Sequence, residues 1–227
     1  GWNLEEAQPE PISSQKETNA AMIHGIEQIT GKVKVLKDGK FKMVNPLEEL
    51  KVSYPNIGTY SAFIFGHPEA ITFPYNFKDL LNSINLAHGN KSTIFVLKII
   101  RKLINLKILT KKTAARFLEW LEKKGTSRKY TETTSLPEIY ALAIGFKNGK
   151  EECVGVSLDG EPSRELTMGE ATGYPLSLGF KMFLNNEITE RGVIAPESKC
   201  IDHKKLLMEI YEMFGMKDAK IKVNKSL

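Results

Sequence analysis

The spacing of apolar residues alternates along the chain between the period of a helix and that of a strand. Apolar residues recur with helical spacing in residues 19–29, 77–86, 92–109, 113–124, 174–185 and 201–214. Alternating or β-rich runs occupy residues 31–44, 60–65, 70–73, 138–146, 152–158 and 219–223. This succession predicts an α+β fold in which helices cover a mixed, largely antiparallel open sheet.

Local signals define several boundaries of these elements. Asp38-Gly39 and Asn148-Gly149 each separate two strand-like runs, and both pairs favour the positive φ angles of a two-residue hairpin turn. Asp202 directly precedes the last long helical segment, and its side chain is suited to capping that helix. We therefore expect two tight hairpins and a capped C-terminal helix.

The composition is that of an ordinary globular protein. The 227 residues carry a formal net charge of +5 and are 41% hydrophobic and 26% charged. The most apolar segment, residues 94–109, is interrupted by Lys and Arg and is unsuited to crossing a membrane. Cys153 and Cys200 lack the spacing of a metal or redox motif, and the few histidines are not clustered with acids. We expect a cytoplasmic protein with reduced thiols, no membrane contact and no metal.

Positive charge is concentrated in one part of the chain. Residues 91–130 contain twelve Lys and Arg and only two acids, while the remainder is mildly acidic. One interpretation is a helix pair that binds an anion or a nucleic acid, and the other is the solvated polar face of two amphipathic helices. Aromatic residues are not interleaved with the basic ones as a base-stacking surface requires. We therefore do not expect nucleic acid as the partner.

The first candidate site follows a β-rich run. His67 and Glu69 flank Pro68 directly after Gly66, and glycine permits close backbone approach or a positive φ. Two groups that carry protons at the end of a strand suit a site for a polar substrate. The alternative is a turn with an exposed histidine.

The second candidate site lies in residues 167–175. Thr172 and Gly173 come shortly before Pro175, and proline is favoured at the first position of a helix. A helix that begins there offers free amides and its positive dipole end to a substrate carboxylate. The alternatives are an ordinary capped helix start and a helix that begins near Thr167 and kinks at Pro175.

Several common functional motifs do not occur in the sequence. It has no GxGxxG after a strand, no P-loop, no HExxH and no GxSxG. We therefore expect no dinucleotide-binding residues in this chain. It begins with Gly rather than Met and has no signal-peptide pattern, which favours a processed protein or a fragment of a longer one.

The order and separation of these segments resemble the saccharopine dehydrogenase-like family. Residues 66–74, GHPEAITFP, are similar to that family's GHPEPVTLP stretch, and residues 168–179 resemble its M…TGYP…G segment. Residues 192–197, GVIAPE, resemble its closing GVxxPE segment, and the turn at residues 38–40 resembles its DGK turn. The resemblance covers roughly residues 23–214.

The resemblance implies a domain organisation. Residues 1–227 would form a single substrate-binding and dimerisation domain, like the C-terminal domain of saccharopine dehydrogenase or of glyceraldehyde-3-phosphate dehydrogenase-like enzymes. In full-length members an N-terminal Rossmann domain binds NAD or NADP, so this domain alone is expected to form a homodimer and to be inactive. A basic helical insert at about residues 76–130 departs from the family pattern.

The resemblance also implies a reaction, with a place in amino-acid and lysine metabolism. Such an NAD(P)-dependent dehydrogenase acts on the CH–NH bond of an amino-acid-derived secondary amine, such as saccharopine or a carboxyspermidine-type compound. The expected catalytic residues are His67, as the local candidate for a group that exchanges protons, and Glu69, which would meet the substrate ammonium. Arg164 could clamp a carboxylate, although a solvated arginine is the alternative. The full expected substrate-binding set is Gly66, Thr72, Arg164, Thr172 and Gly173.

Two other functions stay open at this point. The chain could be a non-enzymatic anion- or nucleic-acid-binding module that uses the basic helices in residues 91–130, in which case affinity would fall steeply with salt. It could also be a stand-alone relative without the cofactor domain that serves as a ligand-binding or scaffold protein. About 130 further upstream residues containing GxGxxG would distinguish the enzyme from the latter.

Overall fold

The computed structural model describes residues 1–4, 18–123, 136, 139–159, 168–216 and 220–225. The helices in these residues are α1 Ala20–Gln28, α2 Glu69–Asn76, α3 Lys91–Asn105, α4 Lys111–Lys123, α5 Met168–Leu184 and α6 His203–Met213. The strands are β1 Trp2–Asn3, β2 Val33–Lys37, β3 Lys40–Val44, β4 Glu49–Tyr54, β5 Gly58–Phe65, β6 Asn85–His88, β7 Tyr140–Lys147, β8 Lys150–Asp159 and β9 Lys220–Lys225.

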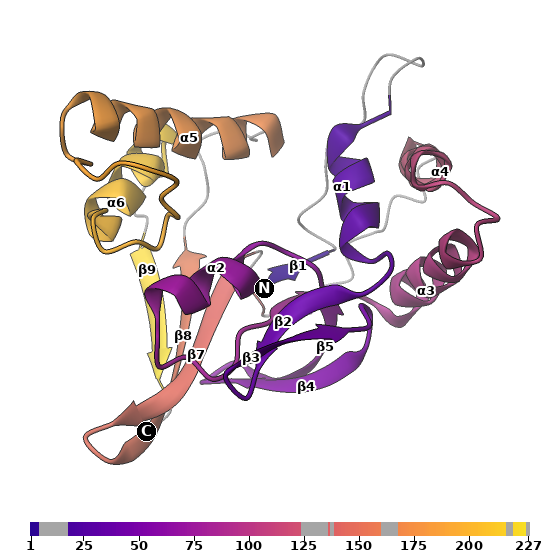
Figure 1. Cartoon of the computed structure of the whole chain (residues 1–227), viewed down its shortest axis with the longest axis horizontal. Coiled ribbons are helices and arrows are strands. Elements are labelled where there is room, and N and C mark those ends of the chain that lie inside the picture. Colours follow the sequence, from indigo (N-terminus) through magenta and orange to yellow (C-terminus); the bar gives the residue numbers. More distant parts are fainter. Residues whose placement is uncertain (5–17, 124–135, 137–138, 160–167, 217–219, 226–227) are drawn as a thin grey trace.

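The architecture is α+β with largely antiparallel sheets, which confirms the predicted fold class. The described strands form three sheets, in the orders β1-β6-β5-β4, β2-β3 and β7-β8-β9. Figure 1 shows α1, α3 and α4 at one end of the molecule and α5 and α6 at the other, with the sheets between them. In the part of the chain that the structure describes, each helix is too short or too polar to cross a membrane.

Strand β5 is the centre of the main core because its second half is buried on both faces. Phe63 and Phe65 pack against apolar residues of α1, α3 and α4. Ile64 points the opposite way and packs against Val33 and Val35 of the β2–β3 hairpin. Successive residues of a strand face opposite sides of the sheet, so the helices cover one face of the four-stranded sheet and the hairpin covers the other.

The third sheet is attached through a smaller cluster of aromatic residues. Tyr140, near the start of β7, packs with Tyr54 at the end of β4 and with the buried Leu136. The Tyr54 and Tyr140 rings meet edge to face with centroids 5.0 Å apart. These contacts join the β7–β8–β9 sheet to the edge of the four-stranded sheet.

Both predicted hairpins are confirmed. Asp38 and Gly39 have φ angles of 54° and 70° between β2 and β3, and Asn148 and Gly149 have φ angles of 53° and 76° between β7 and β8. Two successive positive φ values define the turn whose twist matches that of the flanking strands. Asp202 also caps α6 as predicted, because its carboxylate accepts a hydrogen bond from the Lys205 amide at 3.0 Å.

The prediction of an extended segment over residues 70–73 is wrong, because these residues lie in α2. The Ile71 and Thr72 amides both donate to the Pro68 carbonyl, at 2.8 and 2.9 Å. The Ala70 amide, which has no partner inside the helix, donates to the Asn85 side chain at 2.9 Å. Asn85 on β6 thus fixes the first turn of α2. Thr72, which was predicted to lie in an extended segment, lies in this helix.

The prediction of a helix over residues 77–86 is also wrong. Leu36 and Ser83 exchange two backbone hydrogen bonds of 3.0 Å, and the Gly39 amide donates to the Leu81 carbonyl at 2.8 Å. Residues 81–83 are therefore held in an extended form against the β2–β3 hairpin, and β6 follows directly. Long-range backbone pairing outweighs the local helical spacing of apolar residues here.

Candidate functional site

The first candidate site begins where β5 ends. Gly66 follows the buried half of that strand, and its amide donates to the Gln28 carbonyl at the end of α1, at 2.9 Å. A Cβ atom on Gly66 would lie only 2.5 Å from Cγ1 of Val33 and 3.2 Å from the Gln28 carbonyl oxygen. The close approach expected of this glycine is therefore present, and its amide is engaged within the fold.

Glu69 lies at the centre of a small hydrogen-bonded cluster. The His67 ring contacts the Glu69 carboxylate through Nδ1, and the Asn85 side-chain amide donates to the same carboxylate oxygen at 3.2 Å. Asn85 is 8% exposed and also holds the first turn of α2 through its carbonyl oxygen. The structure therefore brings His67 and Glu69 together, and it adds Asn85, which the sequence analysis did not identify.

The charge state of this cluster follows from its contacts. Partial burial of Glu69 opposes ionisation, but hydrogen bonds from His67, the backbone and Asn85 outweigh it and lower the pKa of the carboxyl group. An ionised carboxylate only accepts hydrogen bonds, so His67 donates its Nδ1 proton to Glu69. In the neutral ring, this leaves the Nε2 lone pair to accept a proton from a ligand.

Aromatic rings line one side of His67. Its ring centroid lies 5.5 Å from that of Trp2 and 5.9 Å from that of His24. The His67 and Glu69 side chains keep 30% and 42% of their surface exposed. The pair is thus oriented by the fold and accessible to solvent, and it can bind a cation or exchange a proton with a ligand.

Helix α2 connects this pair to another segment of the resemblance. At its last residue, the Asn76 side chain donates to Glu197 and accepts from Ser198, both at 3.3 Å. The end of α2, two residues beyond the 66–74 stretch, is thus held next to Glu197, the last residue of the 192–197 segment, although 121 positions separate Asn76 from Glu197. Thr72 is half-buried, one turn after Glu69 on the same helix.

The second candidate site differs from the expected anion site. Helix α5 begins at Met168, so Thr172 and Gly173 lie one turn inside it and their amides are placed to bond within the helix. Both residues are exposed, and no contact joins either of them to His67 or Glu69 in the described part of the chain. An anion site made by a helix start at Thr172 and Gly173 is therefore wrong, and the alternative start near residue 167 is found. Arg164 lies outside the described residues.

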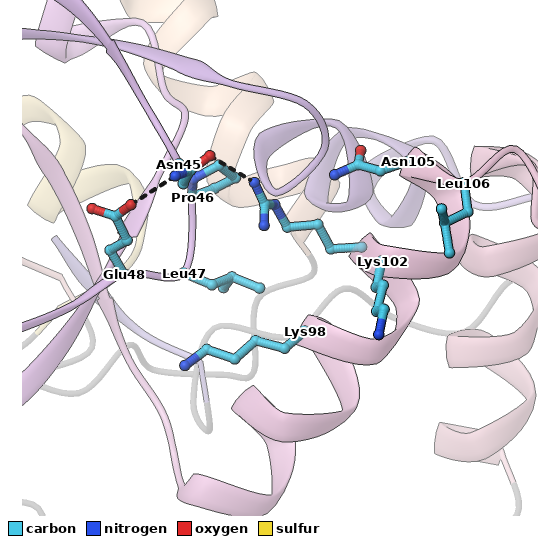
Figure 2. Close-up of a pocket in the computed structure, with 9 residues that line it drawn as sticks. Asn45, Pro46, Leu47, Glu48, Lys98, Lys102, Asn105 and Leu106 are labelled. Atoms are coloured by element: carbon cyan, nitrogen blue, oxygen red, sulfur yellow. Dashed lines mark hydrogen bonds between the residues drawn. The ribbon is translucent and has the colours of Figure 1, made fainter.

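A second region with ligand-suited side chains lies on α3. An open pocket of about 580 Å³ separates this helix from the β3–β4 connection (Figure 2), and its lining includes Leu47, Glu48, Lys98, Arg101, Lys102 and Asn105. None of these residues belongs to the His67–Glu69 cluster. The basic character of this segment is evident from the sequence, but no sequence pattern indicates that part of it lines a pocket.

A third group of polar side chains is buried between the sheets. His88 is 3% exposed. Its Nδ1 donates to the Ser61 carbonyl at 2.6 Å, and its Nε2 accepts from the Tyr54 hydroxyl at 2.8 Å. Burial lowers the pKa of His88 and raises the pKa of Tyr54 to about 12, so both groups are neutral at pH 7. With their mutual bonds satisfied, they act as structural residues.

Among the described residues, no group of three His, Cys, Asp or Glu side chains could hold a metal ion. Cys153 and Cys200 are both reduced thiols. Burial raises the pKa of each thiol, which lowers their reactivity as nucleophiles at neutral pH. Neither cysteine therefore adds a reactive group to the His67–Glu69 cluster.

Comparison with known proteins leaves the geometry as the main guide to function. No family model matches the chain, and no curated protein is significantly similar to it.

Proposed function

We propose that this chain is the C-terminal substrate-binding domain of a saccharopine dehydrogenase-like NAD(P)-dependent oxidoreductase, which acts on the CH–NH bond of an amino-acid-derived secondary amine. The main observation behind the proposal is the His67–Glu69–Asn85 cluster, in which two residues of the GHPE stretch of the resemblance are brought together and joined by Asn85 of β6. The contact of Asn76 with Glu197 and Ser198 adds support, since it joins the end of the helix that follows from that stretch to the last residue of the GVIAPE segment.

In this proposal the two side chains have different tasks. Glu69 is an anion at neutral pH and half-exposed, so it pairs with an ammonium group of the substrate and positions it. His67 donates its Nδ1–H to Glu69 in a hydrogen bond. In the neutral ring Nε2 can therefore accept the proton that the secondary amine loses, while the hydride from the adjacent carbon would pass to NAD(P)⁺ as the imine forms. Asn85 keeps the carboxylate in place and acts as a positioning residue.

The sequence lacks the motif that usually holds a nicotinamide cofactor. The sequence has no Gly-rich turn between a strand and a helix to cradle a pyrophosphate. The proposal therefore assigns NAD(P) to a domain outside these residues, and the 227-residue chain is expected to bind the amine substrate without the cofactor.

The proposal includes a homodimer that forms through the β7–β8–β9 sheet. Tyr140 and Leu142 of β7 pack into the aromatic cluster. Ile144 and Phe146 lie on the same face of that strand but are 64% and 80% exposed. An edge strand with an uncovered apolar face is suited to contact a second copy.

The test is calorimetric titration of the chain with saccharopine and related dicarboxylic secondary amines. We expect Glu69→Gln to weaken binding about tenfold or more, because loss of a charge-assisted contact costs about 1.5–3 kcal/mol. Glu151→Gln, at an exposed position on β8, is the matched control and should bind like the parent protein. Absence of binding by the parent, or equal affinities of the parent and Glu69→Gln, would refute the proposed site.

A further inference from the structure

Most charged side chains that line the pocket on α3 are positive. Lys98, Arg101 and Lys102 lie within about one turn and line the same cavity, and α3 contains no Asp or Glu at all. Like charges four residues apart on a helix repel each other. Three positive charges on one turn therefore destabilise the helix unless an anion neutralises them.

The protein supplies little of that neutralisation. Glu48 is the only acid in the pocket lining, and its carboxylate accepts a hydrogen bond from Asn45 at 2.9 Å. Among the described residues, no ion pair joins an acid to Lys98, Arg101 or Lys102. Lys98 lies over the Phe63 ring at 5.7 Å. A hydrogen bond from Ser61 is the main cause of the lowered pKa of the exposed Glu49, and the Lys98 charge adds only a small contribution. The net charge facing the cavity is therefore positive.

Arg101 is held in place by hydrogen bonds that use only part of its guanidinium donors. One terminal nitrogen, Nη2, donates to the Gly31 carbonyl and to the Asn45 side chain, both at 3.2 Å. Its Nε is buried and has no partner in the described residues. These contacts fix the guanidinium before any ligand arrives, and the other terminal nitrogen, Nη1, is left for a ligand. A side chain that is already ordered loses less entropy on binding.

Asn105 adds a neutral donor to the same wall. Its side-chain oxygen accepts from the Gly31 amide at 3.3 Å, which leaves its NH₂ group available to donate. In Figure 2 the Lys98 side chain extends from α3 toward Leu47 and Glu48, and Lys102 and Asn105 follow along the same helix. The lining of the cavity thus includes two lysines, an arginine and an amide donor, with apolar surface from Leu47.

We propose that this pocket binds the phosphate group of a small soluble phosphate monoester. A phosphate monoester carries a charge of about −1.5 to −2 at neutral pH and offers three oxygens to donors that approach from different directions. Lysine and arginine are both established phosphate ligands in proteins. The cavity of about 580 Å³ is within the usual size range of small-molecule sites, roughly 300–1,000 Å³, so the organic part of the ester can lie against Leu47.

Phenyl phosphate is the probe that tests this proposal, by calorimetry and by NMR of the intact chain. We expect the parent protein to bind it and the Lys98→Gln/Lys102→Gln variant to lose at least about tenfold in affinity. The control, Lys91→Gln/Lys112→Gln, removes the same charge from exposed positions outside the pocket lining and should stay within about twofold. Amide shifts on binding should concentrate at residues 45–48 and 98–106.

Comparison ligands separate this site from its alternatives. Sulfate that binds as tightly as phenyl phosphate, or glutarate that binds more tightly, would overturn the assignment to a phosphate monoester. A third outcome is that phenyl phosphate does not bind, while oligothymidylate binds and both double variants weaken its binding equally. This outcome would indicate a diffuse nucleic-acid surface and would also overturn the assignment to a phosphate monoester. Glu69→Gln should leave phenyl phosphate binding unchanged, so this result is independent of the proposed function.

Discussion

The Tyr54 hydroxyl donates a hydrogen bond of 2.8 Å to Nε2 of His88, and both side chains are buried between two sheets. Because the other ring nitrogen of His88 donates to the Ser61 carbonyl, the imidazole is held as one neutral tautomer. Tyr54 is also in edge-to-face contact with Tyr140. This hydrogen bond therefore lies where the β7–β8–β9 sheet meets the main sheet, next to the two backbone hydrogen bonds between Gly1 and Tyr140.

Removal of the Tyr54 hydroxyl should destabilise the fold. Tyr54→Phe keeps the ring contacts but leaves Nε2 of the buried His88 without a donor, and an unsatisfied buried group costs about 1–3 kcal/mol. Urea unfolding followed by circular dichroism measures this loss in the free energy of unfolding. Tyr75→Phe is the control, because Tyr75 is 63% exposed, and it should change stability by less than about 0.5 kcal/mol. Equal stabilities of the two variants would contradict the role of this bond.

The same histidine should make stability depend on pH. Burial is the main cause of the lowered pKa of His88 and outweighs its hydrogen bond to Ser61. The unfolded chain therefore binds a proton near pH 6.5 that the folded protein does not bind. The stability due to neutral His88 is complete above that pH and is lost as the pH falls below it, by up to about 1.4 kcal/mol per unit.

Urea unfolding between about pH 7.5 and 5.5 tests this dependence. His88→Gln should be less stable at every pH and should show a flatter slope in this window. Glu69 also has a lowered pKa, but its stabilisation is lost at lower pH, below the ordinary carboxyl value of 4.5. The two contributions are therefore separate, and an unchanged slope in His88→Gln would contradict the account of His88.

Substitution of Gly66 should test the close approach at the end of β5. Gly66→Ala places a Cβ 2.5 Å from Val33 and 3.2 Å from the Gln28 backbone, and overpacking of this kind costs about 1–3 kcal/mol. Gly25→Ala in α1 is the matched control, since nothing lies within 4 Å of its Cβ position. It should raise the unfolding free energy by up to about 1 kcal/mol, because alanine favours a helix. Thermal or urea unfolding of both variants measures these opposite signs.

The proposed dimer can be tested at Phe146. Phe146→Asp puts a charge on the uncovered apolar face of β7 and should shift the protein from the dimer to a species of 25.5 kDa in light scattering. Phe95→Asp is the control, because Phe95 is 64% exposed on α3, away from that sheet. A parent protein that is monomeric at high concentration would refute the dimer.

Elements governed by neighbouring residues were predictable from the sequence. The hairpin at Asp38-Gly39 depends on two backbone conformations that those residues favour, and α1 begins where the Asn19 side chain accepts from the Ala21 amide. Residues 70–86 depend instead on distant partners. The pairing of Leu36 with Ser83 has no counterpart in the local pattern, so a helical spacing of apolar residues gave the wrong element.

The candidate site also combines contacts that are local in sequence, and were predictable, with long-range contacts that were not. His67 and Glu69 are two positions apart on either side of a proline, so their contact is local and their pairing was predictable. Asn85 comes from a strand 16 positions from Glu69 in a segment that was predicted to be helical. Thr172 and Gly173 were misplaced because Pro175 is compatible with both the start and the interior of a helix, and the observed helix begins at Met168.

The attachment of α2 at both ends has a consequence for the order of folding. A helix of eight residues with Pro74 inside it is too short to persist by itself in water. Its first turn is held by Asn85 and its last residue by Glu197, which is 121 positions further along the chain. A loop of that length is slow to close, so the last turn of α2 is expected to be fixed only after the segment around Glu197 has docked, whereas Asn85 can fix the first turn and Glu69 earlier.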